Sequence, residues 1–402
     1  MPHAIIIGGS MGGLFAANLL ITNGWDVTVF ERSKGNLAGR GAGLGSQPPL
    51  FQTMKRLGLS IDANTFYSVE ARQCLDFDGK TIVHIPLHNT GTAWDLVYGQ
   101  LRRALPDSRY QQSMEFVGLD QSGKHVTAFF QDGTSATGDL LIGADGLHSE
   151  VRHKLAPSVQ PEYAGYVSWR SLVPSTRIQQ EHRKLLSENM NFCLPDGEMV
   201  MTTPVPQRAD EPGILRCQFS WFRPADISLV EDLCTDAAGN KHGTSIPPPL
   251  IRPELIQRLK TRAKEILAPQ VAALIQAAEN MILQPIFDLA SERMVFGRVV
   301  LLGDAAFVAR PHVGTGVTKV ALDAAALADA LTESGGDIAA ALKSYEFQRL
   351  KAGQGLVDRG RYLGQYLSGQ IKPRDERTAA EVYRLPERYL QEFGAAGTIQ
   401  TV

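Results

Sequence analysis

Residues 4–20, AIIIGGSMGGLFAANLL, decide the fold of this chain. The apolar run at 4–8 is typical of a parallel strand that is buried on both faces. Residues 12–23 predict a helix that Gly24 ends. The segment WDVTVFERS, at 25–33, predicts a second strand. The glycine-rich turn after the first strand therefore lies in the βαβ unit that a dinucleotide-binding turn requires.

The turn GGSMGG, at 8–13, departs from the pattern G-x-G-x-x-G at Ser10. Gly8 suits the tight turn, Gly13 lets helix and strand pack closely, and the exposed N–H groups of the helix start suit a pyrophosphate. The serine either moves the phosphate slightly outward or donates a hydrogen bond to it. Glu31 ends the second strand, where an acid accepts hydrogen bonds from ribose hydroxyls, and Arg32 beside it leaves a 2′-phosphorylated ribose open. A flexible turn without a ligand is the alternative; the βαβ context and Glu31 favour a nucleotide.

Three later segments carry the same kind of signal. The stretch RGAGLGSQPPL, at 40–50, is either a surface loop or backbone brought close to a flat ligand. A buried strand ends at Asp145-Gly146, and this acid either faces a ligand at the sheet edge or caps the following helix. A third strand ends at Gly303-Asp304, and Gly314-Thr315-Gly316 then opens a long alanine-rich helix.

The middle of the chain differs in pattern. Runs within 163–223 alternate and are rich in β-branched and aromatic residues, which predicts an antiparallel sheet, and helices are expected at 253–266, 268–279 and 341–367. The expected fold is α/β, with a parallel sheet, an inserted, mostly antiparallel sheet and C-terminal helices. We place the nucleotide-binding domain at 1–67, 91–162 and 282–370, the substrate domain at 68–90 and 163–281, and an irregular tail without chemistry at 371–402.

The composition excludes several classes of protein. The 402 residues include 40 Lys and Arg against 42 Asp and Glu, so no basic excess favours binding to nucleic acid or to a membrane surface. Four cysteines without a C-x-x-C pair or a histidine cluster predict no metal site. Few cysteines and no secretory or membrane-spanning segment indicate a cytoplasmic protein, which we expect to be a monomer or homodimer.

Four segments together resemble one family: IIIGGSMGGLFAANLL…VTVFERS, RGAGLGSQP, DLLIGADGLHSEVR and GRVVLLGDAA…RPHVGTG. They are similar to the single-component FAD-dependent aromatic hydroxylases, the group of p-hydroxybenzoate and salicylate hydroxylases. Within it, YAGYVSWR, RPH at 310–312 and Lys319 resemble the members that act on hydroxypyridines.

The resemblance implies a Rossmann-like FAD-binding domain and a flavin-dependent aromatic hydroxylase. Bound FAD, with NADH or NADPH and O2 as co-substrates, would hydroxylate a small hydroxylated ring, such as a hydroxypyridine, through a C4a-hydroperoxyflavin. The residues implied in FAD binding are Gly8, Ser10, Met11, Gly13, Glu31, Arg32, Arg40, Gly43, Leu44, Asp145, Gly146, Asp304, Pro311, Gly314, Thr315, Gly316 and Val317.

Residues near the substrate are harder to assign. The Pro311 carbonyl can accept a hydrogen bond from a ring hydroxyl, and His312 is either a base or relay or a loop histidine bonded to backbone. Gln218 and Trp221 lie three apart on one predicted strand and face opposite sides, Trp221 with Cys217, so the sequence leaves the pocket face open. The candidate substrate contacts are Thr203, Cys217, Gln218, Trp221 and His312.

Other functions stay open at this point. An FAD-dependent epoxidase or reductase would use the same cofactor residues. A plain NAD-dependent dehydrogenase would explain the first 31 residues but not Gly303-Asp304 and the loop after it. A flavin-holding regulatory protein without turnover is the alternative of another class.

Overall fold

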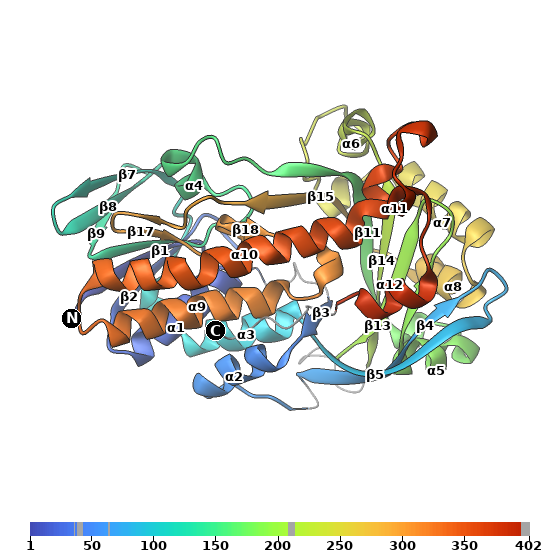
Figure 1. Cartoon of the computed structure of the whole chain (residues 1–402), viewed down its shortest axis with the longest axis horizontal. Helices are drawn as coiled ribbons and strands as arrows, with labels where there is room; N and C mark the ends of the chain where they lie inside the picture. Colours follow the sequence, from blue (N-terminus) through green and yellow to red (C-terminus); the bar gives the residue numbers. More distant parts are fainter. Residues whose placement is uncertain (36, 38–42, 63–64, 208–213, 395–402) are drawn as a thin grey trace.

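The computed structural model describes all residues except 36, 38–42, 63–64, 208–213 and 395–402. Two large sheets organise the chain (Figure 1), and a small three-stranded sheet lies beside the first of them. The small sheet consists of β7 (Phe116–Ser122), β8 (His125–Phe130) and β9 (Ser135–Gly138). The expected α/β fold, with one parallel and one mostly antiparallel sheet, is confirmed.

The first large sheet is built around β1. This strand pairs in parallel with β10 on one side and β2 on the other, and the isoleucines of β1 are buried. Only the edge strand β16 runs antiparallel to its neighbour. In order across the sheet, the strands are β16 (Val295–Phe296), β17 (Val299–Leu301), β10 (Leu140–Gly143), β1 (His3–Ile7), β2 (Asp26–Glu31) and β6 (Tyr110–Gln112).

The helices of this half pack through apolar faces. Helix α1 (Met11–Thr22) contacts α9 (Gly316–Glu333), and α9 contacts the long helix α10 (Ile338–Gly369). Figure 1 shows α10 running from this half of the molecule to the other, where it contacts the second sheet. The remaining helices of this half are α2 (Pro48–Arg56), α3 (Trp94–Ala104) and α4 (Glu150–Leu155).

The second large sheet has nine strands and mostly antiparallel pairs. In order they are β18 (Phe307–Val308), β15 (Ile282–Ala290), β11 (Glu162–Pro174), β14 (Arg216–Pro224), β13 (Met199–Val205), β12 (Asn189–Cys193), β4 (Phe66–Leu75), β5 (Thr81–Ala93) and β3 (Gly43–Ser46).

One face of the nine-stranded sheet is closed by a helical core. Its β14 residues pack with α7 (Pro253–Ile266) and α8 (Pro269–Ala277) in one apolar cluster. Helices α5 (Gln180–Glu188) and α6 (Ile227–Leu233) add to this cluster. Because this face is filled, the opposite face of the sheet is the one available for a ligand.

Most predicted elements are confirmed, but the tail is not irregular. Helices α11 (Ala379–Val382) and α12 (Pro386–Glu392) lie beyond residue 371. Tyr389, Leu390 and Phe393 are buried against the second sheet in a cluster with Phe192 and Tyr166. The prediction was wrong because the apolar partners of this short segment lie far away in sequence.

The sheets also bear on the proposed domain boundaries. Strand β3 lies in the nine-stranded sheet, as does β15, although both were assigned to the nucleotide-binding domain. The division into domains remains a proposal, with the two sheets as its natural cores.

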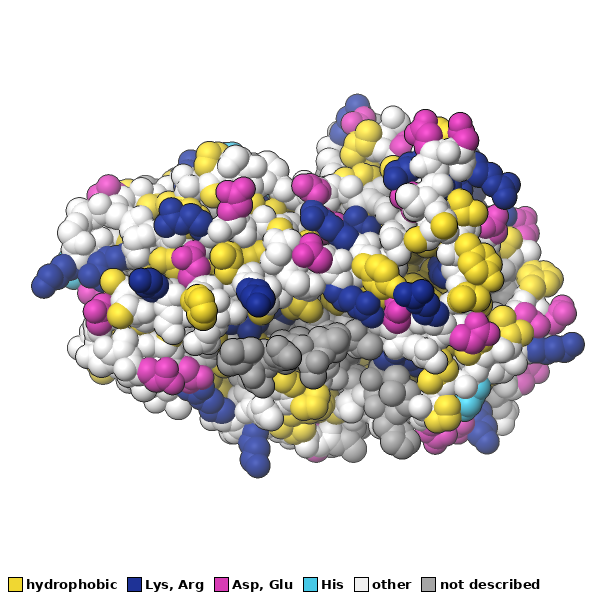
Figure 2. All heavy atoms as spheres, viewed as in Figure 1, with side chains coloured by type: hydrophobic (Ala, Val, Ile, Leu, Met, Phe, Trp, Pro, Cys, Tyr) yellow, Lys and Arg dark blue, Asp and Glu magenta, His cyan; other side chains and the backbone are white. Residues whose placement is uncertain are grey.

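Charges on the described surface are mixed. On the face seen in Figure 2, basic and acidic side chains are interspersed over both halves. Within the described residues, no helix combines the length and the apolar character that crossing a membrane needs. The same residues contain no group of three or more acidic, histidine or cysteine side chains that could hold a metal ion.

Candidate active site

The first glycine turn is tightly packed. Gly8 has a positive φ of 106°, and a Cβ on Gly13 would lie 1.9 Å from the Gly8 carbonyl oxygen. Ser10 is the N-cap of α1 but makes no side-chain capping bond, and Met11 is buried at the helix start. The helix therefore begins close to β1. The Ser10 side chain does not cap the N–H groups of the first turn, which leaves them free of that side chain for a phosphate.

Glu31 holds this turn from the end of β2. Its Oε2 accepts a hydrogen bond from the Gly9 N–H at 2.8 Å and its Oε1 accepts one from the Ser33 N–H at 2.9 Å. Each carboxylate oxygen keeps a second acceptor site, so the predicted contact with ribose is compatible with these bonds. Arg32 points into solvent.

The acid after β10 organises the start of α4. Asp145 accepts hydrogen bonds from the Ser149 hydroxyl and, at 3.1 Å, from the Val151 N–H. Ser149, not Asp145, is the N-cap, because its hydroxyl accepts the Arg152 N–H at 2.9 Å. Burial raises the pKa of Asp145, and the hydrogen bond from Ser149 opposes that shift. Gly146, with a φ of 83°, lets the chain turn here.

Arg152, which sequence reasoning missed, connects this loop to the next. Its guanidinium donates to the carbonyls of Leu147 and Ala305 at 2.6 and 2.9 Å. A Cβ on Gly12 would contact both Leu302 and Ala144. The three turns after β1, β10 and β17 therefore meet at one edge of the parallel sheet.

A buried ion network fixes the turn after β17. The Lys319 ammonium donates to the Gly303 carbonyl at 2.8 Å and pairs with Asp323 at 2.9 Å, while Arg349 pairs with the other Asp323 oxygen at 2.7 Å. Desolvation would raise the pKa of Asp323, but Lys319 and Arg349 outweigh it and hold that pKa below its ordinary value. The carboxylate of Asp304 is accessible from the cavity described below. Desolvation by the protein around it raises the pKa of Asp304, and the positive charge of Lys319 opposes this shift.

The start of α9 forms one wall of a cavity of about 340 Å³. Thr315 is the N-cap and makes no side-chain capping bond, and its buried hydroxyl has no partner within the described residues. Gly45 of β3 approaches so closely that a Cβ there would lie 2.6 Å from the Gly314 carbonyl oxygen. The predicted cofactor residues on this wall are Gly43, Leu44, Asp304, Pro311, Gly314, Thr315, Gly316 and Val317.

These features fit FAD. The α1 and α9 starts lack side-chain caps, the glycines hold backbone where a Cβ has no room, and Asp304 lies in the cavity as a free acceptor. Arg40, also predicted to bind FAD, lies outside the described residues.

The nine-stranded sheet forms the opposite wall. Gln218 of β14 and Thr203 of β13 are paired across the strands, and both line the cavity. The Gln218 amide oxygen accepts the Gly43 N–H, and its nitrogen donates to the Ser220 hydroxyl at 3.2 Å. Tyr67 lines the same wall, and burial raises its pKa.

Cys217 and Trp221 lie on the other face of β14. The Trp221 ring is in the helical core and its indole N–H donates to Glu198 at 2.7 Å, while the Cys217 thiol points at the Leu186 carbonyl. Strand alternation sends these side chains away from the cavity, which corrects their selection as substrate contacts.

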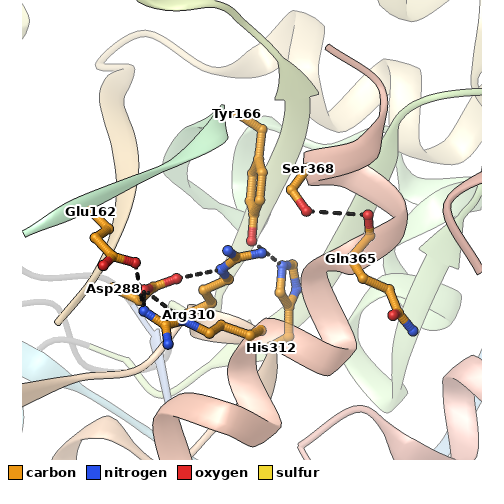
Figure 3. Close-up of polar contacts among 8 residues, drawn as sticks. Glu162, Tyr166, Asp288, Arg310, His312, Gln365 and Ser368 are labelled. Atoms are coloured by element: carbon orange, nitrogen blue, oxygen red, sulfur yellow. Dashed lines mark hydrogen bonds and ion pairs between the residues drawn. The ribbon is translucent and has the colours of Figure 1, made fainter. Parts of the chain in front are cut away.

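The structure also corrects the expectation for His312. Its ring is completely buried, with Nε2 2.8 Å from the Tyr166 hydroxyl and Nδ1 3.3 Å from the Tyr389 hydroxyl. Figure 3 shows the Tyr166 hydroxyl directed at this ring, with Arg310 and Asp288 beside it. Burial, with nearby Arg310, lowers the pKa of His312 to about 3. The ring does not line the cavity, so its position suits a fixed, neutral support for the neighbouring loop.

Other lining residues were not predicted. Arg72 and Arg170 enter the cavity from β4 and β11, and Phe393 and Gly394 enter from the C-terminal segment. A charged residue within an apolar strand, as in YVSWRSLV, was the available signal for Arg170. No local signal pointed to Phe393 and Gly394.

The chain is similar to flavoproteins of known activity. A family model described as FAD binding domain-like matches residues 163–288. The 2,6-dihydroxypyridine 3-monooxygenase of Paenarthrobacter nicotinovorans is 31% identical over 373 residues, which cover 92% of each chain. The solved 2,6-dihydroxypyridine-3-hydroxylase from Arthrobacter nicotinovorans has a TM-score of 0.86 at 29% identity and covers 96% of this chain and 97% of its own.

A second solved relative contains ligands. The Klebsiella pneumoniae HpxO protein, complexed with FAD and uric acid, is similar with a TM-score of 0.74 at 27% identity, over 92% of this chain and 89% of its own.

Proposed function

Because this chain belongs to the family of FAD-dependent aromatic monooxygenases, we propose that it hydroxylates a small nitrogen heterocycle of the hydroxypyridine kind. It is an FAD enzyme that acts on an aromatic ring, with NADH or NADPH and O2 as co-substrates. The polar strand residues Thr203 and Gln218, which line the cavity opposite the start of α9, carry the proposal of a small ring with polar substituents.

Bound FAD would supply the redox chemistry of a hydroxylation in which NAD(P)H is the electron donor, one atom of O2 enters the ring and the other is released as water. The protein supplies position and charge. We propose that the Gly8–Gly13 turn and Glu31 hold the nucleotide half of FAD and that Asp304 accepts hydrogen bonds from the hydroxylated chain. The N–H groups at Gly316 and Val317 would face the electron-rich ring system, where the helix dipole contributes about 0.3–2 kcal/mol.

Two further properties of the cavity support ring hydroxylation. Apolar side chains from several elements, among them Leu44, Met190, Met201 and Ile286, limit the access of water to the reacting atoms. Pro311 lines the cavity, and its carbonyl, which accepts the Gly314 N–H at 3.0 Å, keeps a second acceptor site for the hydroxyl proton of the substrate. An electron-rich ring oxygen held in this way favours attack on the ring.

Two finer proposals concern the protein outside its site. The four cysteines are buried free thiols, which fits a reducing compartment and hence the cytoplasm. We also propose a monomer or homodimer.

The proposal is tested with purified, FAD-loaded protein. NADH and NADPH oxidation is measured against hydroxypyridines and hydroxybenzoates, and products are analysed after reaction under ¹⁸O2. We expect substrate-stimulated oxidation and one labelled oxygen in a hydroxypyridine product. Stimulation by hydroxybenzoates alone would overturn the proposed substrate class, and oxidation without labelled product would point to a reductase.

A further inference from the structure

Two arginines line the sheet wall of the cavity. Arg170 lies on β11, and Arg72 lies on β4, four strands away. Strand spacing puts their Cα atoms about 19 Å apart. Between them on the same wall lie Gln218 and Thr203, so the two guanidinium groups flank the polar floor of the proposed substrate pocket.

Arg170 is held in a fixed position by neutral groups. Its Nε donates to the Ser220 hydroxyl at 3.2 Å and its Nη1 donates to the Gln284 amide oxygen at 2.8 Å. Ser220 also accepts from Gln218, which in turn accepts the Gly43 N–H of the cofactor wall. Nη2 has no hydrogen-bond partner within the described part of the chain, so a ligand oxygen can use it.

Arg72 is also held without a carboxylate. It is 1% exposed, and its Nη1 donates to the Leu390 carbonyl at 2.8 Å. Its buried Nε has no partner among the residues that the structure describes. Burial lowers the pKa of each of these two arginines to about 10, so both remain charged at neutral pH.

Several other buried cations near the cavity have matching acids. Lys319 and Arg349 share Asp323, and Asp304 lies close enough to Lys319 to interact with it. Outside this group, Arg310 pairs with Asp288 at 2.8 Å and Arg216 pairs with Asp95 at 3.1 Å. Arg170 and Arg72 form no such pair with any described carboxylate. An unmatched buried charge is costly, so these two positions favour a ligand that brings negative charge.

We propose that Arg170 binds an anionic oxygen of the ring substrate and that Arg72 adds positive charge at the far end of the cavity, so that the enzyme selects rings that carry an ionised hydroxyl or a carboxylate. This inference rests on the proposed function and adds the charge of the substrate to it. Arg170 is the direct contact because its orientation is fixed and one nitrogen is free. In this arrangement, the substrate oxygen completes the hydrogen bonds of that guanidinium.

The test measures ligand binding to the FAD-loaded protein through the change in flavin fluorescence. The probes are 6-hydroxynicotinate, its neutral carboxamide analogue, and 2,6-dihydroxypyridine. Each is measured with the wild type, Arg170→Met, Arg170→Lys and the control Arg223→Met. Arg223 lies on neighbouring β14 but pairs with Glu198 at 3.1 Å, and it does not line the cavity.

We expect Arg170→Met to weaken binding of the charged probes about 10- to 100-fold, as loss of a charged hydrogen bond does, and to change binding of the neutral amide less than threefold. Arg170→Lys should recover part of the loss, and Arg223→Met should leave binding unchanged. If Arg170→Met does not fold with FAD, the comparison of wild type with Arg170→Lys and Arg170→Gln decides instead.

The pH dependence of binding distinguishes an ionised ring hydroxyl from a carboxylate as the source of the negative charge. Affinity that follows the ionisation of the ring hydroxyl indicates an oxyanion, and affinity constant above the carboxyl pKa indicates a carboxylate. Wild-type affinities that depend neither on the carboxylate nor on ionisation of the ring hydroxyl, or unchanged anion binding in Arg170→Met, would overturn the inference. Either result leaves turnover of the wild type intact, whereas absence of turnover with every ring would instead overturn the proposed function.

Discussion

The two walls of the cavity treat charge in opposite ways. On the α9 wall, Lys319 and Arg349 both pair with Asp323, Asp304 lies near Lys319, and the network ends on the Gly303 carbonyl. On the sheet wall, Arg170 and Arg72 are held by neutral oxygens. A wall with matched charges keeps its shape by itself, which suits a permanent cofactor. A wall with unmatched charges is completed by what binds, which suits a substrate that comes and goes.

The strongest way to break the α9 wall is Asp323→Ala. It leaves Arg349 without its buried counter-ion and Lys319 without its direct ion-pair partner, so we expect a loss of about 3–5 kcal/mol in the free energy of unfolding and loss of FAD from the purified protein. Denaturant unfolding and the flavin content measure both effects. Asp329→Ala on the same helix removes an acid that is half exposed and paired with Arg56, and should change stability by less than about 0.5 kcal/mol. Equal losses in both variants would contradict the role of the buried network.

The second prediction concerns the glycine turn that positions the first phosphate site. A Cβ at Gly13 would lie 1.9 Å from the Gly8 carbonyl oxygen, so Gly13→Ala must open the turn. We expect FAD to bind about 100-fold more weakly, a loss of about 2.7 kcal/mol, measured by titration of the apoprotein. Gly118→Ala is the control, because a Cβ there meets nothing within 4 Å. Retention of FAD by Gly13→Ala would show that the turn does not set the affinity.

The third prediction concerns His312 and the pH dependence of the free energy of unfolding. The pKa of His312 is about 3 in the folded protein and about 6.5 in an unfolded chain. The unfolded chain therefore binds more protons in this window, and stability falls as the pH drops from 6.5 toward 3. Between pH 6.5 and 4.5 this amounts to about 2–3 kcal/mol.

His312→Gln should flatten that pH dependence of unfolding, while the exposed His153→Gln should retain it. A variant at 312 that follows the wild-type curve would place the acid sensitivity elsewhere. In His312→Gln, the pH dependence of kcat should have the same midpoints as in the wild type, because the ring does not line the cavity.

The smallest effect distinguishes the two faces of β14. Gln218→Ala removes a side chain that lines the cavity, and we expect KM for the ring substrate to rise about 10-fold, as for loss of one hydrogen bond. Cys217→Ala, one residue away on the opposite face, should leave KM within twofold. Steady-state kinetics measures both. A similar rise in both variants would mean that Gln218 acts through packing of the strand.

Local sequence was sufficient for the cofactor side. A βαβ unit, three strand ends with acids or glycines and a Gly-Thr-Gly helix start are all short segments whose geometry follows from backbone physics. They therefore predicted the parallel sheet and the α9 wall. Ser10 did not disturb the turn, because its side chain makes no capping bond and leaves the helix start accessible.

The substrate side depends on contacts between distant segments. Alternation along β14 predicted that Gln218 and Trp221 face opposite ways, but only the position of α7 and α8 decided which face is closed. His312 was ambiguous because its enclosure depends on Tyr166 and Tyr389, 146 and 77 residues away. Helix α12 was not predicted for the same reason, because the residues it packs against lie far away in sequence.

The position of Phe393 and Gly394 has a consequence for synthesis of the protein. Gly394 is held to the loop by the hydrogen bond from its N–H to the His312 carbonyl at 2.8 Å, and both residues follow every other lining residue along the chain. The ribosome adds about 5–20 residues each second, so the glycine turns and the sheet exist before this last panel is made. Phe393 and Gly394 are therefore the last part of the cavity wall to be synthesised, and the wall is incomplete on this side until they pack against the loop.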